Sequence, residues 1–84
     1  MPTPKMPRDV SGRELSRLLG RYGYAIVRET GSHIRLVSTY CRTEHRITIP
    51  DHQPIKIGTL NSILFDIAEY LRMPKQDLAK ELFD

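Results

Sequence analysis

The sequence has little of what several large classes of protein require. Its 84 residues include one cysteine and no tryptophan, and no apolar run approaches the roughly 18 residues that span a membrane. The lone Cys41 excludes an internal disulfide framework and a metal site built from several cysteines, and it favours a cytoplasmic location. The chain also lacks a glycine-rich phosphate loop, a paired acidic dyad and a Ser–His–Asp pattern. Membrane-spanning, disulfide-stapled and common nucleotide-binding proteins are therefore disfavoured.

The length of the chain limits the size of its core. A protein this short buries only roughly 60–65% of the surface that its unfolded chain exposes, so a deep, enclosed active site is not expected. The first seven residues contain three prolines and lack the apolar stretch of a secretory signal. We expect a flexible, proline-rich tail over residues 1–9 and a single domain over residues 10–84.

The net charge is only +3, but the charges are unevenly distributed. Residues 1–59 carry ten Lys and Arg against five Asp and Glu, whereas residues 60–84 carry three against five. Arginine has a planar guanidinium that suits phosphate, so the pattern indicates either a polyanionic partner or an ordinary solvated surface. The arginines before residue 60 are Arg8, Arg13, Arg17, Arg21, Arg28, Arg35, Arg42 and Arg46.

A first helix is predicted over residues 12–22. Ser11 and Glu14 form a capping box, and Val10 and Leu15 occupy the two positions of a hydrophobic staple. Gly23 is a plausible end to the helix. The apolar stripe is Leu15, Leu18, Leu19 and Tyr22, and the opposite side carries Arg13, Arg17 and Arg21.

Three strand-like runs follow, over residues 24–29, 32–39 and 44–49, and an antiparallel meander is their simplest arrangement. A second helix is predicted from Gly58-Thr59 to about residue 71, because apolar residues recur there at helical spacing. Pro74 suits the first turn of a last, short helix. The expected order is thus α-β-β-β-α with a C-terminal helix, and helices covering one face of the sheet.

The open face of the sheet is where chemistry is expected. Ile34 and Leu36 alternate with His33 and Arg35, and Ile47 and Ile49 alternate with Arg46 and Thr48. If the isoleucines and Leu36 point to the core, the other four side chains point to solvent. A two-residue turn at Thr30-Gly31 pairs Arg28 with His33, which surrounds one imidazole with three arginines, whereas a turn of odd length would turn the first strand over.

The remaining candidates have weaker signals. His45 is in register with Ile47 and is expected at the edge of the core. His52 lies in a Pro-flanked loop, where it is either an ordinary turn residue or a functional residue. Three histidines could hold zinc, but their spacings of twelve and seven residues match no metal motif. Cys41 has no evident activating base. The helix start at Gly58-Thr59 offers free amides to an anion.

Several short motifs carry a family resemblance over roughly residues 8–68. They are Ser11-Gly12-Arg13-Glu14-Leu15 with Leu18-Leu19, Gly23-Tyr24, Arg28 followed by Gly31-Ser32-His33, Ile49-Pro50-Asp51-His52, Ile57-Gly58-Thr59-Leu60 and Ile63-Leu64. In this order they resemble the HicA family of toxins, small messenger-RNA interferases of prokaryotic toxin–antitoxin pairs. The resemblance implies an α+β fold like that of double-stranded-RNA-binding domains. It also implies a catalytic histidine in the Gly-Ser-His motif, here His33, and a HicB-type antitoxin that covers the active face.

These observations favour the toxin of a type II toxin–antitoxin system that cleaves mRNA without a metal or other cofactor. RNA supplies its own nucleophile, the 2′-hydroxyl, and His33 would act as general base or acid. The second proton carrier stays open, with His52 as a candidate, and so does the oligomeric state. The residues expected to bind RNA and its phosphates are Arg28, Ser32, Arg35, Arg46, His52, Lys56 and Thr59.

Two alternatives from other classes remain. The same charge and fold would suit a non-catalytic RNA-binding module in which His33 is only a contact. The acidic, helical C-terminal segment would suit a protein-interaction domain with no nucleic-acid role.

Overall fold

The structure is a computed structural model that describes residues 9–83. The expected tail over residues 1–9 therefore lies outside the described residues, apart from Asp9, and so does Arg8. Within the described range, no helix is both long and apolar enough to cross a membrane.

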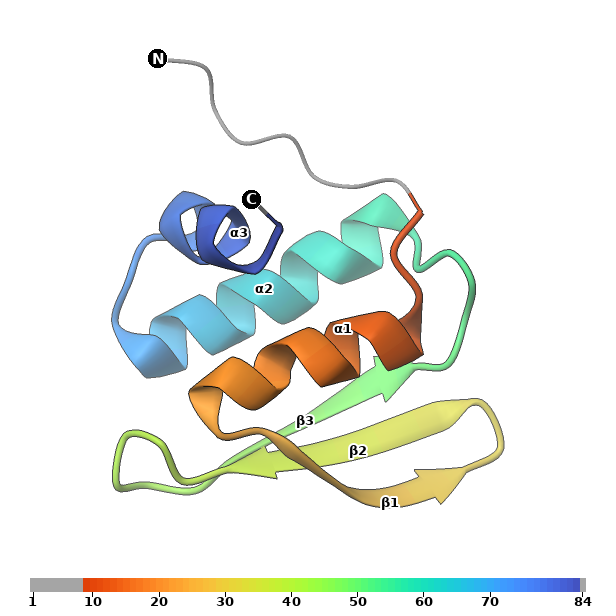
Figure 1. Ribbon diagram of the computed structural model, residues 1–84, viewed down its shortest axis with the longest axis horizontal. Helices are drawn as coiled ribbons and strands as arrows, with labels where there is room; N and C mark the ends of the chain where they lie inside the picture. Colours follow the sequence, from red (N-terminus) through yellow and green to blue (C-terminus); the bar gives the residue numbers. More distant parts are fainter. Residues whose placement is uncertain (1–8, 84) are drawn as a thin grey trace.

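The elements occur in the predicted order, with helices on one side of a three-stranded sheet (Figure 1). Helices α1 and α2 pack on the sheet, and helix α3 packs against α2. The other face of the sheet is left open, as in the predicted α+β fold. The elements are α1 (Gly12–Leu18), the 3-10 helix η1 (Leu19–Tyr22), β1 (Ala25–Thr30), β2 (His33–Ser38), β3 (His45–Pro50), α2 (Ile57–Leu71) and α3 (Lys75–Phe83).

The first helix begins and ends where the sequence predicts. The Ser11 hydroxyl accepts a hydrogen bond from the Glu14 amide at 3.1 Å, and Val10 and Leu15 are both buried. The last turn tightens into η1, and the chain then leaves the helix at Gly23, whose φ of +76° is left-handed. Residues 12–22 are thus helical as expected, with a 3-10 final turn.

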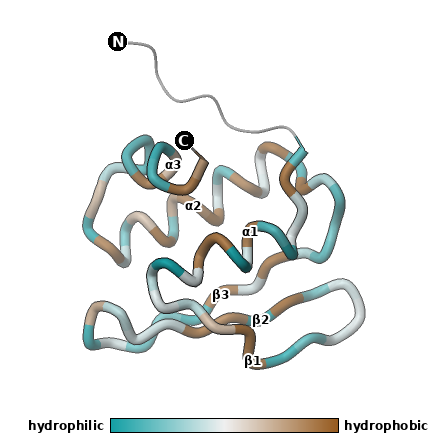
Figure 2. The backbone as a smooth tube through the Cα atoms, in the orientation of Figure 1, coloured by the Kyte–Doolittle hydropathy of each residue, from teal (hydrophilic) through white to brown (hydrophobic). Residues whose placement is uncertain are grey.

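The alternation of the strands is confirmed. Ile34 pairs with Ile49 and Leu36 with Ile47, and all four side chains lie in the core. His33, Arg35, Arg46 and Thr48 are exposed on the opposite face. Figure 2 shows hydrophobic residues recurring along the sheet and along α1 and α2, and the core lies between these layers.

The predicted pairing of Arg28 with His33 is wrong. The hairpin loop is Gly31-Ser32 instead of Thr30-Gly31, so Thr30 pairs with His33 and Arg28 pairs with Arg35. Gly31 takes a left-handed φ of +57° as the first loop residue, which lets β1 continue through Thr30. A bulge at Val27 then shifts the pairing of the earlier part of β1 by one residue, so that Ile26 pairs with Leu36. Arg28 still shares the open face with Arg35.

Helices α2 and α3 close the far side of the core. Leu60, Leu64 and Ile67 are fully buried on α2, and Leu78 and Leu82 are buried on α3. Helix α2 ends at Leu71, and the C-cap residue Arg72 adopts a left-handed φ of 58°. The predicted second helix and last short helix are both confirmed.

The start of α1 is pressed against the segment that leaves β3. The Gly12 amide donates to the His52 carbonyl at 3.0 Å, and the Ile55 amide donates to the Val10 carbonyl at 2.9 Å. A Cβ on Gly12 would stand only 2.1 Å from the Pro50 carbonyl oxygen. The loop over residues 51–56 is therefore bound to the helix by its backbone, and only glycine permits the approach.

We predict that Gly12→Ala destabilises the protein by roughly 1–3 kcal/mol, because the methyl group forces α1 away from Pro50. Gly20→Ala is the matched control, since a Cβ at Gly20 meets nothing within 4 Å. Urea unfolding measures both. Equal stability of the two variants would contradict the close approach.

Candidate functional site

A pocket of about 400 Å³ opens at the end of the sheet where β2 begins and β3 ends. Its walls come from the sheet, from the loop after β3 and from the start of α2. The lining residues are His33, Thr48, Pro50, His52, Lys56 and Thr59. Below, these six residues are called the histidine pocket.

Backbone pairing fixes the parts of the histidine pocket relative to one another. His33 lies directly opposite Pro50 in the ladder between β2 and β3. Beyond the ladder, the Asp51 amide donates to the Ser32 carbonyl at 2.6 Å, which extends the pairing by one more bond. The hydrogen bond from Gly12 then holds His52, two residues past Pro50. The two histidines are thus placed by rigid backbone and not by a free loop.

The start of α2 makes the histidine pocket favourable for an anion. Lys56 is the N-cap residue and its side chain makes no capping hydrogen bond. Within residues 9–83, no side chain accepts a hydrogen bond from the first amides of the helix, and the helix dipole adds positive potential at this end. Lys56 brings a full positive charge, and no carboxylate is among the lining residues.

His33 and His52 are both exposed. Within residues 9–83, neither imidazole makes a hydrogen bond or an ion pair with another side chain or with the backbone. Their ring nitrogens are consequently open to a ligand in the pocket.

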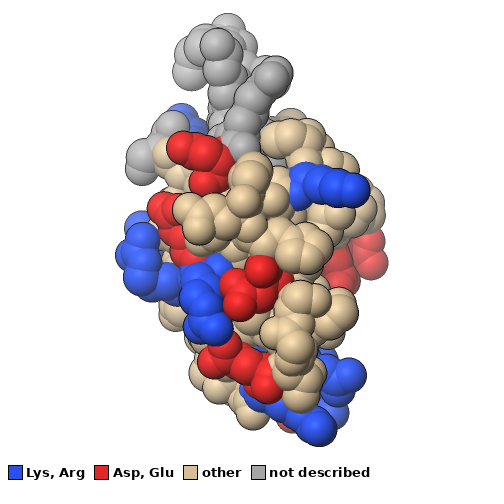
Figure 3. Space-filling view, turned by 90° about the vertical axis from the view of Figure 1, so that its right-hand side faces the viewer, with Lys and Arg blue, Asp and Glu red and all other residues tan. Residues whose placement is uncertain are grey.

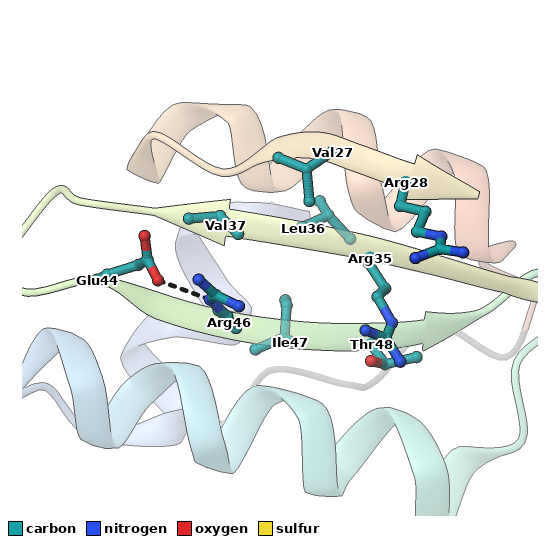
Figure 4. A pocket seen from close by; sticks show the side chains of 9 residues that line it. All are labelled: Val27, Arg28, Arg35, Leu36, Val37, Glu44, Arg46, Ile47 and Thr48. Carbon is teal, nitrogen blue, oxygen red and sulfur yellow. Dashed lines mark hydrogen bonds and ion pairs between the residues drawn. The ribbon is translucent and has the colours of Figure 1, made fainter. Parts of the chain in front are cut away.

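A second pocket of about 470 Å³ lies further along the open face (Figure 4). Arg28 on β1 and Arg35 on β2 lie close together, and Arg35 extends toward Thr48 on β3. We call this the arginine pocket. Its lining residues are Val27, Arg28, Arg35, Leu36, Val37, Glu44, Arg46, Ile47 and Thr48. Thr48 belongs to both pockets, so the two are continuous across the sheet.

The three arginines of this pocket are not equivalent. The Arg46 Nε atom donates to a Glu44 carboxylate oxygen at 2.6 Å, which partly neutralises its charge. Among the described residues, Arg28 and Arg35 form no ion pair. The sequence did not single out Glu44 as a site residue. Its position two residues before Arg46 nevertheless predicts that the two side chains lie on the same side of an extended chain.

The structure groups the predicted site residues into two sets. His33, His52, Lys56 and Thr59 line the histidine pocket, whereas Arg28, Arg35 and Arg46 line the arginine pocket. Ser32 lines neither, and its carbonyl is used to bind the Asp51 amide.

The arginines of the first helix belong to the scaffold. Arg13 forms ion pairs with Glu29 at the end of β1 and with Asp51 after β3. Arg21 donates to the Glu81 carbonyl at 2.5 Å, which ties α3 to η1. Figure 3 shows cations and anions interspersed on the side of the molecule that it presents. The stripe predicted on this helix is a mixed surface, because Arg13 pairs with two carboxylates and Arg17 lies 4.0 Å from the carboxylate of Glu14.

His45 lies at the edge of the core, as predicted. The hydroxyl of Tyr24 contacts its Nδ1 at 2.6 Å, Asp66 contacts its Nε2 at 3.2 Å, and the ring stacks on Tyr70 at 4.6 Å. Since a carboxylate only accepts, a neutral imidazole in this position donates from Nε2 to Asp66 and accepts at Nδ1 from the Tyr24 hydroxyl. Tyr24 is 4% exposed, and burial, followed by the nearby Tyr70 and Asp66, raises the pKa of its hydroxyl well above the ordinary value. The chain of Asp66, His45 and Tyr24 is thus a structural network with no accessible nucleophile.

The zinc hypothesis finds no support in the placement of the donors. His45 belongs to the core side of the sheet, whereas His33 and His52 face the open pocket. No group of three or more His, Cys, Asp or Glu side chains suited to a metal ion occurs in residues 9–83.

We predict that Tyr24→Phe lowers the free energy of unfolding by about 1 kcal/mol, because His45 loses its donor. The loss of stability at high pH should also become shallower. A raised pKa means that the folded state holds this proton more tightly, so the contribution is complete below about pH 10 and is lost as the pH rises above it.

Chemical denaturation between pH 7 and pH 11 measures both effects. Tyr40→Phe is the control, since Tyr40 is 60% exposed. An alkaline stability curve that is identical in Tyr24→Phe and the wild type would contradict the network.

A comparison with known families gives a match. A family model described as HicA toxin of bacterial toxin–antitoxin matches residues 12–68. The matched segment runs from α1 through most of α2 and includes every residue that lines either pocket. Comparisons with curated proteins and with solved structures give no match.

Proposed function

Because the chain belongs to the HicA toxin family of bacterial toxin–antitoxin systems, we propose that it is an endoribonuclease that cleaves mRNA without a metal. The observation that carries the proposal is the histidine pocket. It combines an exposed imidazole, His33, with a lysine and the N-terminus of α2 on an open surface. Such a surface can receive a polymer that a closed cleft would exclude.

The chemistry needs proton transfer beside a phosphate. The 2′-hydroxyl of RNA attacks the adjacent phosphorus, and the 5′-oxygen of the next nucleotide leaves, which yields a 2′,3′-cyclic phosphate and a 5′-hydroxyl. His33 is the side chain that exchanges a proton with the reacting oxygens. General acid or base catalysis of this kind contributes about 10²–10⁴ in rate.

Positively charged and hydrogen-bond-donating groups around His33 would stabilise the phosphate as its charge develops. Lys56, Thr59, His52 and the free amides of α2 are the groups that line the pocket, and Ser32 lies in the adjoining turn. Arg28, Arg35 and Arg46 would then bind a neighbouring part of the same strand, because the arginine pocket continues from the histidine pocket at Thr48.

The family also supports a partner, since its members function with a cognate antitoxin. A HicB-type antitoxin that covers the open face would block both pockets together, because they share one side of the sheet. We place this activity in the cytoplasm, where mRNA is available.

We predict that His33→Ala lowers the RNA-cleavage rate by at least about 100-fold while the fold is unchanged, because His33 is exposed and packs in no core. The assay uses purified protein, a long unstructured transcript and EDTA throughout. Tyr40→Phe, on an exposed tyrosine away from both pockets, is the control for handling and folding.

Full activity of His33→Ala would refute the catalytic role. RNA binding by the wild type without cleavage would instead indicate the non-catalytic RNA-binding module. Activity that EDTA abolishes would refute metal independence.

We predict that Arg28→Ala and Arg35→Ala each weaken RNA binding more than Arg46→Ala does, because Glu44 already partly neutralises Arg46. The probe is a 2′-O-methyl oligonucleotide, which lacks the nucleophilic hydroxyl. For a single strand, the slope of log K against log salt becomes shallower by about 0.7 for each phosphate that the variant no longer neutralises. Equal effects of the three substitutions would contradict the proposed difference.

A further inference from the structure

We propose that His52 is the second proton-transfer residue of the site and works as the partner of His33. The proposal rests on the ribonuclease function above and deepens it. The sequence alone leaves the partner open, whereas the structure brings both imidazoles to one pocket.

The cleavage step requires two proton transfers. A base removes the proton of the 2′-hydroxyl as the O2′–P bond forms, and an acid donates a proton to the 5′-oxygen as the P–O5′ bond breaks. The two transfers balance, since the base gains one proton and the acid loses one. No water, oxidant or further reactant takes part. A single imidazole cannot begin the step in both protonation states, so a second group is required.

The position of His52 is set by three backbone hydrogen bonds. The Gly12 amide binds the His52 carbonyl, the Ile55 amide binds the Val10 carbonyl, and the Asp51 amide binds the Ser32 carbonyl. The last bond links the His52 loop directly to the residue before His33. The distance between the two histidines is therefore governed by the ends of β2 and β3, which pair at His33 and Pro50.

The surroundings of His52 leave its imidazole available for catalysis. Within the described residues the His52 imidazole has no hydrogen-bond or ion-pair partner, whereas the His45 imidazole contacts Tyr24 and Asp66. Asp51, its neighbour in sequence, pairs with Arg13.

The charged and titratable groups that line the pocket are few. They are His33 from β2, His52 from the loop and Lys56 at the start of α2, while the lining residues of β3 are the uncharged Thr48 and Pro50. Of these side-chain types, imidazole is the one that ordinarily changes charge between pH 5 and pH 8. Lys56 is better suited to binding the phosphate, which leaves the two histidines as the acid and the base.

The first test measures the rate and the binding of His52→Gln and His52→Ala. We expect kcat to fall by about 100-fold or more in both, while affinity for the 2′-O-methyl oligonucleotide changes by less than about 3-fold. Gln53→Ala is the matched control, because Gln53 is exposed on the same loop and does not line the pocket. A loss of affinity that accounts for the whole loss of rate would show that His52 only binds the phosphate, and would overturn the proposal.

The second test separates acid from base. After the cleavage site of the transcript is mapped, the leaving 5′-oxygen is replaced by sulfur, which leaves without protonation. The variant that lacks the acid should recover on this substrate, whereas the variant that lacks the base should not. We expect recovery in one and only one of His33→Ala and His52→Ala. Recovery in both or in neither would overturn the pairing.

A third readout is the pH profile. The wild type should show a bell-shaped dependence of kcat/KM, and each single-histidine variant should lose one limb. If His33→Ala is inactive but His52→Gln keeps wild-type activity and a bell-shaped profile, the inference fails and the ribonuclease function stands. If His33→Ala is fully active, the ribonuclease mechanism itself fails.

Discussion

The structure depends on the close approach between the start of α1 and the end of β3. Gly12 lies against the Pro50 carbonyl, and its amide binds the backbone of the loop that follows. This contact sets the first helix on the sheet and turns residues 51–56 toward the beginning of β2. The same backbone bonds that anchor a helix thereby bring His52 to His33, so the stability of the fold and the geometry of the pocket have one origin.

The second constraint is that the helices cover only one face of the sheet. The isoleucines of β2 and β3 and Leu36 point to the covered face. Because successive side chains of a strand point to opposite faces, the residues between them lie on the open face. An open face with two shallow, connected pockets suits a substrate that is long, flexible and negatively charged, because such a substrate can be bound along its length.

Most of the helices and strands were predictable from the sequence, because they depend on patterns among neighbouring residues. The N-cap at Ser11, the apolar stripes of the helices and the strand alternation are short-range patterns, and the structure confirms them. The pairing of Arg28 was not predictable, since it depends on the hairpin loop being Gly31-Ser32, one residue later than the Thr30-Gly31 turn that the sequence suggests. Contacts between distant segments also escaped prediction. The contact of Tyr24 with His45 joins residues 21 positions apart. The close approach of Gly12 to Pro50 is indicated in the sequence only by the glycine itself.

The central claim is that this protein cleaves RNA by internal attack of the 2′-hydroxyl, with histidine as the proton carrier. The most direct measurement is the chemical identity of the ends formed when the purified protein cuts a transcript in EDTA. The account predicts 2′,3′-cyclic phosphate and 5′-hydroxyl ends that disappear in His33→Ala. Products with 5′-phosphate ends, or cleavage that persists in His33→Ala, would contradict it.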